Sequence, residues 1–297
     1  MKSVAIPAAV AVLGIVHAVV LLAGFVAPYP FDEQHRDYPY TPPMTIAGPA
    51  RVQFLVNGRL FGVPQPGAIF LLGTDGYGRD VFSRLLYGGR VSLLTGLLAA
   101  FLSLGLGSIL GAVSGFYGGW LDRLLMRSGE LFLALPWLYL LLAVRALLPL
   151  HISTVHAFLL LIVVIGAIGW VRPARLVRGV VLSGKERGFV MAARGFGASD
   201  FYLMRRHILP MTAGVVLTQA TVLIPQYILA EVTLSFLGLG VSEPVPSWGN
   251  MLAEAKQYYT LVSHPWLLAP GLAAIPVLLA YLILADGLLA RQKSQSL

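Results

Sequence analysis

Two acids, Glu231 and Asp286, fall near the ends of long apolar segments, where they could carry out proton chemistry. An ionisable side chain in such a segment is costly, so each acid is a candidate functional residue. A pair of acids would suit an intramembrane aspartyl protease, but one is a glutamate and the two are expected at opposite membrane depths. We interpret Glu231, Asp286 and the nearby Ser235 as groups for gating or helix packing, and an intramembrane enzyme remains the alternative.

Other catalytic motifs are weak. The stretch GVVLSGKE (Gly179–Glu186) is close to the phosphate-binding loop G-x-x-x-x-G-K-[ST], but Glu186 replaces the hydroxyl that holds magnesium and no strand precedes it. The chain has no cysteine, and His151 and His156 are five residues apart, not four as in helical zinc pairs. We therefore expect no catalytic residues, no metal site and no cofactor bound by this chain.

The composition predicts an all-α integral membrane protein. Hydrophobic residues make up 57% of the 297 residues and charged residues only 11%, whereas soluble domains carry about 25% charged residues. A span needs about 20 apolar residues. Six transmembrane helices are predicted, at roughly Val4–Ala27, Ser92–Phe116, Leu131–Leu150, Val155–Val171, Met211–Leu229 and Leu267–Ala290.

The basic residues indicate the orientation. Most lie at the N-terminus, after the second span, between Arg172 and Arg206, and in the C-terminal tail, which predicts that both termini are cytoplasmic. This placement explains the net charge of +8 without nucleic acid. The first span could be a cleaved signal peptide, but its apolar run exceeds the roughly 7–15 residues of a signal sequence, so we expect it to be retained.

The sequence suggests three regions: residues 1–91 with the first span and an external loop, residues 92–290 with five core helices, and a cytoplasmic tail at 291–297. Within the insertion at 45–70, apolar alternation around Asn57-Gly58 predicts a small β-hairpin. In the second span a small residue recurs every fourth position, which favours close helix packing in a membrane. These residues are Thr95, Ala99, Ser103, Gly107, Gly111, Gly115 and Gly119.

The loop at about 172–210 contains the polar stretch MAARGFGASDFYLMRRHILP. It predicts two short helices around a glycine turn, with Gly195 and Gly197 ending the first and Ser199 or Asp200 capping the second. Phe201, Met204 and Ile208 are expected on one face of the second helix. Such a protrusion lacks a small-molecule pocket and suits the groove of a partner protein.

At these residues the chain resembles permeases of ABC-type importers, in the branch that serves dipeptides, oligopeptides and, in some members, nickel. The family's signature is Glu-Ala-Ala, three residues, Gly, nine residues, Ile, any residue, Leu-Pro. The matching positions are Met191-Ala192-Ala193, Gly197, His207 and Leu209-Pro210. Met191 and His207 depart from the pattern, and the missing acid removes one expected ion pair with the ATPase.

Three further segments are similar to the family: Gly73–Gly96, Gly115–Arg127 and Ala230–Leu252. The resemblance covers about Gly73 to Leu289. It implies the type I importer permease fold in a bacterial inner membrane. It also implies a second permease, two cytoplasmic ATPases that bind ATP and Mg, and an extracytoplasmic solute-binding protein, as well as contact with membrane lipid.

The resemblance assigns coupling to the ATPase to one group of residues: Ala192, Ala193, Gly197, Ala198, Ser199, Asp200, Arg205, Arg206, His207 and Pro210. Di- or oligopeptides are the expected solute at the level of the family, and no substrate-binding residue is assigned. A secondary transporter that needs no ATPase is the remaining alternative, although we see no inverted internal repeat of the kind such folds carry.

Overall fold

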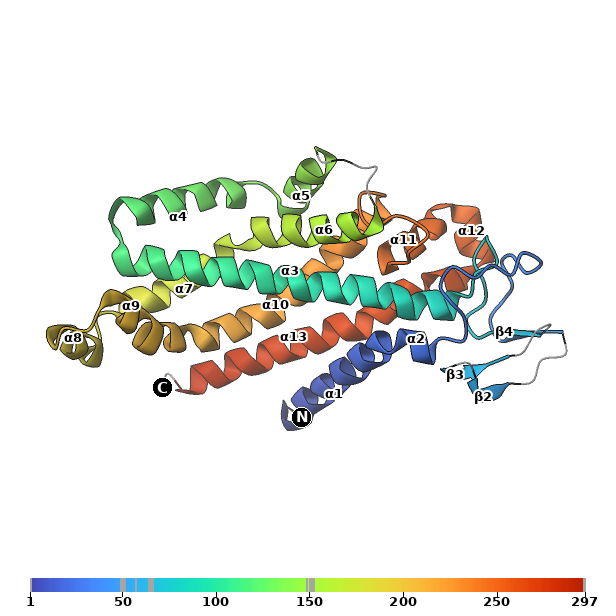
Figure 1. The fold of residues 1–297 in the computed structure, drawn as a ribbon, viewed down its shortest axis with the longest axis horizontal. Helices are drawn as coiled ribbons and strands as arrows, with labels where there is room; N and C mark the ends of the chain where they lie inside the picture. The colour runs from blue at the N-terminus through green and yellow to red at the C-terminus, as the bar shows by residue number, and fades with distance from the viewer. Residues whose placement is uncertain are drawn as a thin grey trace. The chain divides into compact units, whose positions relative to one another are not determined.

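The computed structural model describes residues 2–48, 52–56, 58–63, 67–147, 149 and 153–295, and it is mostly helical (Figure 1). The contacts divide the chain into two compact units. The first unit comprises residues 1–95, 150–159 and 228–283. The second comprises residues 96–149, 160–227 and 284–297. Each unit is described by itself.

The first unit begins with two helices and four short strands. Helices α1 (Lys2–Leu21) and α2 (Ala23–Val26) precede β1 (Thr45–Ala47), β2 (Gln53–Val56), β3 (Arg59–Gly62) and β4 (Ala68–Phe70). Strands β2 and β3 pair antiparallel, with Phe54 opposite Phe61, and Gly58 between them has φ +74°. The predicted hairpin is therefore confirmed, although Asn57 lies outside the described residues. A second antiparallel pair, β1 with β4, was not expected.

Apolar helices long enough to cross a membrane follow. The described residues contain three: α3 (Val81–Tyr117), the helical stretch Asp200–Phe236 that ends in α10 (Leu209–Phe236), and Pro265–Ala290, which includes most of α13 (Ala269–Gln295). Counting each of two bent helix pairs as one span gives up to five. The apolar part of α1, Ala5–Leu21, is shorter.

One of the bent pairs corrects a predicted span, whereas the bend of the other falls at the end of the span predicted at Val155–Val171. Helices α4 (Gly119–Ala134) and α5 (Trp137–Ala146) meet at an angle of 93°, where a continuous span at Leu131–Leu150 was expected. Pro136 lacks an N–H group and takes an extended conformation, with φ −59° and ψ 123°, so the helix ends before it. Helices α6 (Thr154–Gly169) and α7 (Val171–Gly184) are bent by 43°.

Short helices connect the long ones. Between α7 and α10 lie α8 (Gly188–Gly195), α9 (Asp200–Leu203) and a π-helical turn, Met204–Ile208. Between α10 and α13 lie α11 (Trp248–Ala253) and α12 (Tyr258–Ser263). The side chain of Trp248 at the start of α11 is buried, and its indole N–H donates to the carbonyl of Leu85.

The small residues of α3 explain how the second unit packs. The backbone of α7 lies against Gly107, Gly111 and Gly115, and a Cβ added at Gly111 would be 2.3 Å from the carbonyl oxygen of Ala174. The ridge ends at Gly115, since Gly118 breaks the helix and Gly119 begins α4. The absence of side chains on this face lets two helix backbones touch, as the fourfold spacing predicts.

Candidate functional site

The hinged segment, residues 185–210, begins with α8 and turns back at Gly197. Gly197 has φ +86°, a conformation that residues with a Cβ rarely adopt. The N–H of Ala198 donates to the carbonyl of Ala193 over 3.1 Å, and the N–H of Gly197 donates to that of Arg194 over 2.9 Å. These two bonds form a Schellman motif, which ends α8 and sets the direction of the chain beyond it. The Ser199 hydroxyl then accepts from the N–H of Tyr202 and caps α9, as predicted.

One side of the hinged segment packs onto the helices beneath it. Val190, Leu203 and Ile208 are buried in a cluster with Phe116 of α3 and Val181 of α7. Leu203 and Ile208 are five residues apart and face the same way, because the π-helical turn holds five residues between its bonded groups. The prediction that Phe201, Met204 and Ile208 share one face of the helix is therefore wrong. Phe201 is 73% exposed, whereas Ile208 is buried.

The opposite side of the hinged segment presents large side chains to solvent. They are Phe189, Met191, Phe196, Phe201 and Tyr202, with exposed fractions from 50% to 93%. Of the residues assigned to coupling, seven are exposed and lie among them: Ala192, Gly197, Ser199, Asp200, Arg205, Arg206 and Pro210. Such an apolar and basic surface is suited to a protein partner.

Three of the residues assigned to coupling are only partly exposed, which gives them a second role in packing. Ala193 and Ala198 pack against the buried cluster beneath the segment. His207 lies between the rings of Phe189 and Tyr202, with centroids 5.8 and 5.7 Å away. The sequence analysis missed Phe189, Phe196 and Tyr202, and aromatic residues inside an otherwise polar stretch were the signal that marked them.

An ion pair supports the base of the hinged segment. Arg178 of α7 donates to Asp122 of α4 through two nitrogens, over 2.5 and 2.6 Å, and the hydroxyl of Ser114 in α3 donates to the same carboxylate. Lys185, directly after α7, donates to the carbonyl of Gly115 at the end of α3 over 2.9 Å. These contacts hold three helices together where the hinged segment begins.

We expect Asp122→Ala to lower the free energy of unfolding by about 1–3 kcal/mol, because a two-pronged and half-buried pair is lost. Glu130→Ala is the matched control on the same two helices. Glu130 meets Arg175 through a single contact of 3.3 Å, and both side chains are exposed, so its loss should cost less than about 1 kcal/mol. Thermal unfolding of the purified variants measures both, and equal losses would contradict the assignment.

In the first unit, the buried acid Glu231 contacts a polar group of its own helix. Its Oε1 accepts a hydrogen bond of 2.6 Å from the hydroxyl of Ser235, which in turn accepts from the N–H of Val241. The hydroxyls of Ser92 and Ser247 also lie against this buried carboxyl group. The pair thus connects α10 to the loop after it. Asp286 belongs to the second unit, where its side chain is exposed.

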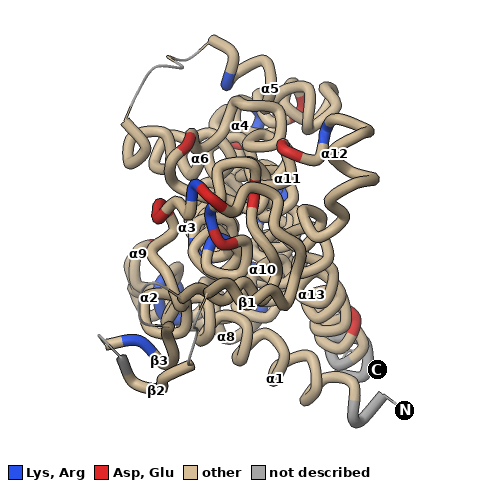
Figure 2. Tube along the Cα trace, turned by 90° about the vertical axis from the view of Figure 1, so that its right-hand side faces the viewer, with Lys and Arg blue, Asp and Glu red and all other residues tan. Residues whose placement is uncertain are grey.

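The first unit also holds a charge cluster that the sequence analysis missed, made of Asp75, Arg79, Arg84, Glu243 and Glu254. Arg79 binds Asp75 over 2.6 Å, Glu243 over 2.7 Å and Glu254 over 3.2 Å, and Arg84 binds Glu243 over 2.8 Å. Figure 2 shows acidic and basic segments gathered near α11. Both arginine side chains are at most 5% exposed, so the cluster connects the start of α3 to Glu243 and Glu254.

The charge cluster has three carboxyl groups for two guanidinium groups, so one carboxyl tends to keep its proton. Burial, followed by the charge of Asp75, raises the pKa of Glu254 from 4.5 to about 7. Burial also raises the pKa of the neighbouring Asp80 from 3.8 to about 6. A raised pKa means that the folded state binds the proton more tightly than the unfolded state does, so these groups stabilise the fold in mild acid.

The stability of the protein should therefore fall as the pH rises from about 4.5 through about 7. We expect Glu254 to account for a loss on the order of 2 kcal/mol, visible in unfolding curves measured across this range. Glu254→Gln should flatten the pH dependence, because the amide does not titrate. A decline of the same size in that variant would assign the effect to other groups.

The described residues contain no group of three or more histidine, aspartate or glutamate side chains placed to hold a metal ion. Of the two histidines considered above, His151 lies outside the described residues. The Nδ1 atom of His156 is 2.6 Å from the hydroxyl of Ser153, so the imidazole has a hydrogen-bond partner at the start of its own helix.

Similarity to known proteins identifies the class of the chain. A family model described as the inner membrane component of binding-protein-dependent transport systems matches residues 107–294, which is more than half of the sequence. The chain belongs to this family. Its members are non-catalytic permease subunits of ABC importers, so both the enzyme and the secondary transporter are set aside. The matched range includes α7, the whole hinged segment and α10.

Related proteins support the same class. The dipeptide transport system permease protein DppC of Bacillus subtilis is 39% identical, over 75% of this chain and 68% of its own length. The oligopeptide transport system permease protein OppC of Haemophilus influenzae is 38% identical, over 76% and 70%. The glutathione transport system permease protein GsiD of Pectobacterium atrosepticum is 36% identical, over 75% and 72%. This ABC permease is therefore a membrane protein that works with ATPase and solute-binding subunits.

Proposed function

We propose that this ABC permease forms half of a pathway that imports di- or oligopeptides, with a second permease completing it. Two ATPases and one extracytoplasmic solute-binding protein complete the assembly. The names of the three relatives support peptides as the solute, since each names a peptide or glutathione. The distribution of the basic residues supports a cytoplasmic position for both termini and for the hinged segment.

The hinged segment is the proposed docking site for one ATPase. The observation that carries this proposal is its two-sided structure, with buried Leu203 and Ile208 on one side and exposed Phe196 and Phe201 on the other. A rigid, glycine-turned projection of this kind can transmit a movement of the ATPase to α7 and α10, which continue from its two ends. The ATP and Mg are held by the partner subunits, and this chain binds no cofactor.

In the proposed mechanism, ATP drives transport by alternating access. When the ATPases close on ATP, they draw the docked segments together, and the helix bundles change which side of the membrane they open to. ATP hydrolysis releases the contact and resets them. A partner can shift such an equilibrium only through different affinities for the two states.

Reconstitution tests the proposal. Vesicles that contain this permease, its paired permease, the ATPases and the solute-binding protein should take up a labelled dipeptide when ATP is supplied on the ATPase side. This permease alone should take up none. A single cysteine in place of Phe196 provides a second measurement, since the chain has no cysteine of its own. The cysteine should cross-link to an ATPase. Uptake by the lone subunit, or no cross-link in the active complex, would contradict the proposal.

A further inference from the structure

A pocket in the second unit lies where two broken helices meet α10. Its lining comes from the α4–α5 break, the α6–α7 break and one turn of α10, and its water-accessible space is about 60 Å³, within a larger hollow that opens to solvent. Non-helical backbone at membrane depth is tolerated where it is buried in protein or lines a cavity, and transporters use such breaks for binding. Two breaks that converge on one pocket therefore mark it as a site for a ligand.

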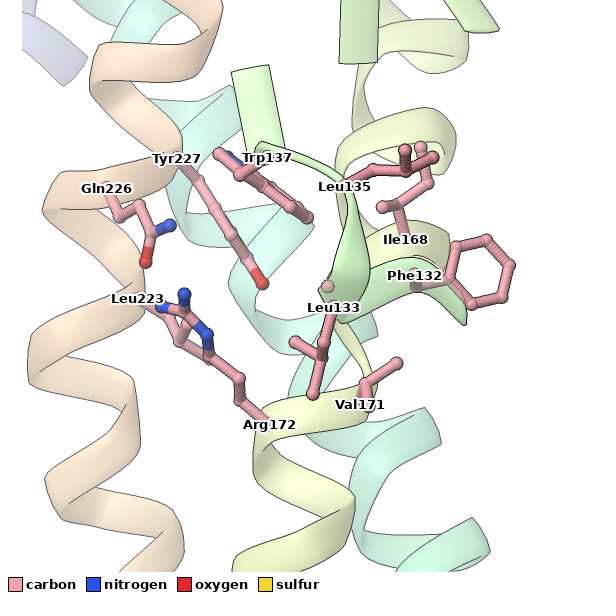
Figure 3. A pocket seen from close by; sticks show the side chains of 11 residues that line it. Phe132, Leu133, Leu135, Trp137, Ile168, Val171, Arg172, Leu223, Gln226 and Tyr227 are labelled. Carbon is pink, nitrogen blue, oxygen red and sulfur yellow. The ribbon is translucent and has the colours of Figure 1, made fainter. Parts of the chain in front are cut away.

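Of the four polar side chains that line this pocket, three lack a hydrogen-bond partner among the described residues. Figure 3 shows the Arg172 side chain extending toward α10, where Gln226 and Tyr227 lie. Within the described residues, neither the guanidinium of Arg172 nor the amide of Gln226 forms a hydrogen bond or ion pair. The indole Nε1 of Trp137 is buried and also lacks a hydrogen-bond partner among them. A buried donor is normally satisfied, so the indole N–H of Trp137 suits a ligand that accepts a hydrogen bond, and the exposed guanidinium of Arg172 is available to the same ligand.

The remaining walls are flat and apolar. The ring of Trp137 stacks on that of Tyr227, with centroids 5.7 Å apart and planes 20° from parallel. The hydroxyl of Tyr227 is already engaged with that of Ser103 over 2.9 Å, so the phenol contributes mainly its ring. Phe132 and Leu133 complete the apolar part of the lining. A ligand here must combine an anionic or amide group with an apolar portion.

The charge of the lining narrows the class of ligand. Arg172 is the one charged side chain among the described residues that line the pocket, and none of them is Asp, Glu or His. A divalent metal ion is therefore disfavoured, because it needs oxygen or imidazole ligands. A guanidinium binds a carboxylate through two parallel bonds, and the free amide of Gln226 can pair with a peptide group.

We propose that this pocket holds the C-terminal carboxylate of a peptide during its passage, with Arg172 binding the carboxylate, Gln226 the adjoining amide and Trp137 a flat or apolar side chain. The inference deepens the proposed function and rests on it. Arg172 is exposed in the single chain, which leaves it accessible to a passing solute.

Transport by the complete complex tests the carboxylate contact. A dipeptide with a free C-terminus is compared with the same dipeptide amidated, with the same solute-binding protein present throughout. Arg172→Gln should raise the KM for the free acid about tenfold, as expected for the loss of one charge-assisted contact, and leave that for the amide unchanged. Arg172→Lys should recover part of the loss. Arg175→Gln, one turn along α7 and outside this pocket, is the matched control and should change neither.

Thiol labelling tests occupancy without transport. Leu133→Cys places a single cysteine in the pocket, in an assembly whose partner subunits have no reactive thiol. The free dipeptide should slow its reaction with a maleimide, the amide should do so less, and Arg172→Gln should remove the difference. Protection of the cysteine without uptake of the dipeptide would refute only the proposed function, whereas uptake without protection would refute only the binding of the peptide in this pocket.

Two further results would overturn the inference. A cysteine that never reacts would show that a partner subunit fills the pocket. Equal effects of Arg172→Gln and Arg175→Gln on the KM would show that the effect is not specific to the pocket.

Discussion

Gly197→Trp is expected to reduce ATP-dependent uptake to background while the chain still inserts into the membrane. No atom lies within 4 Å of a Cβ built at Gly197, so the new ring has space in the lone subunit and projects from the exposed side of the hinged segment. In the complex, the ring occupies the space that the ATPase needs. The positive φ adds roughly 1–2 kcal/mol of local strain. Uptake and substrate-stimulated ATP hydrolysis in reconstituted vesicles measure the effect.

Two variants separate the bulk of the tryptophan from other causes. Gly197→Ala carries the same backbone strain without the ring and should keep most of the uptake. Gly14→Trp adds the same ring at another open glycine, in α1, and should be close to the wild type. If Gly197→Trp transports normally, or if Gly197→Ala fails as completely, the hinged segment does not dock the ATPase in the proposed way.

Gly111→Val is expected to prevent stable folding of the second unit. A Cβ at this position would lie 2.3 Å from the carbonyl oxygen and 2.9 Å from the Cα of Ala174, and backbone atoms cannot move aside as a side chain can. Helices α3 and α7 would have to separate. Overpacking a core typically lowers the free energy of unfolding by about 1–3 kcal/mol, and we expect a larger loss here. The measurement is the yield of monodisperse protein in detergent, together with its unfolding temperature.

Gly105→Val is the matched control, because it makes the same substitution in the same helix. Gly105 is exposed, and no atom lies within 4 Å of a Cβ added there, so the variant meets no clash, and valine has a slightly higher helix propensity than glycine. We expect normal yield and an unchanged or slightly higher unfolding temperature. Similar losses for the two variants would mean that contact with α7 does not govern this part of α3.

The features that depend on short stretches of sequence were predictable. The apolar segments, the β2–β3 hairpin, the fourfold ridge of α3 and the capped glycine turn at Gly197 each follow from residues close together in the chain. Hydropathy, turn conformation and helix capping act over one or a few turns, so the sequence alone indicates them. The π-helical turn at Met204–Ile208 was not predictable in this way, because packing of Leu203 and Ile208 against α3 and α7 accompanies it.

By itself, then, the sequence determined that this chain lies in a membrane, and it determined where a projecting, glycine-turned segment interrupts the apolar helices. Only the tertiary structure decided which polar groups meet. Arg79 and Glu243 are 164 positions apart, and helix α6 lies between Trp137 and Arg172 in the sequence, although both line one pocket. The role of a buried charge or of an unpartnered donor depends on the groups that lie next to it in space, and helix packing determines which groups those are.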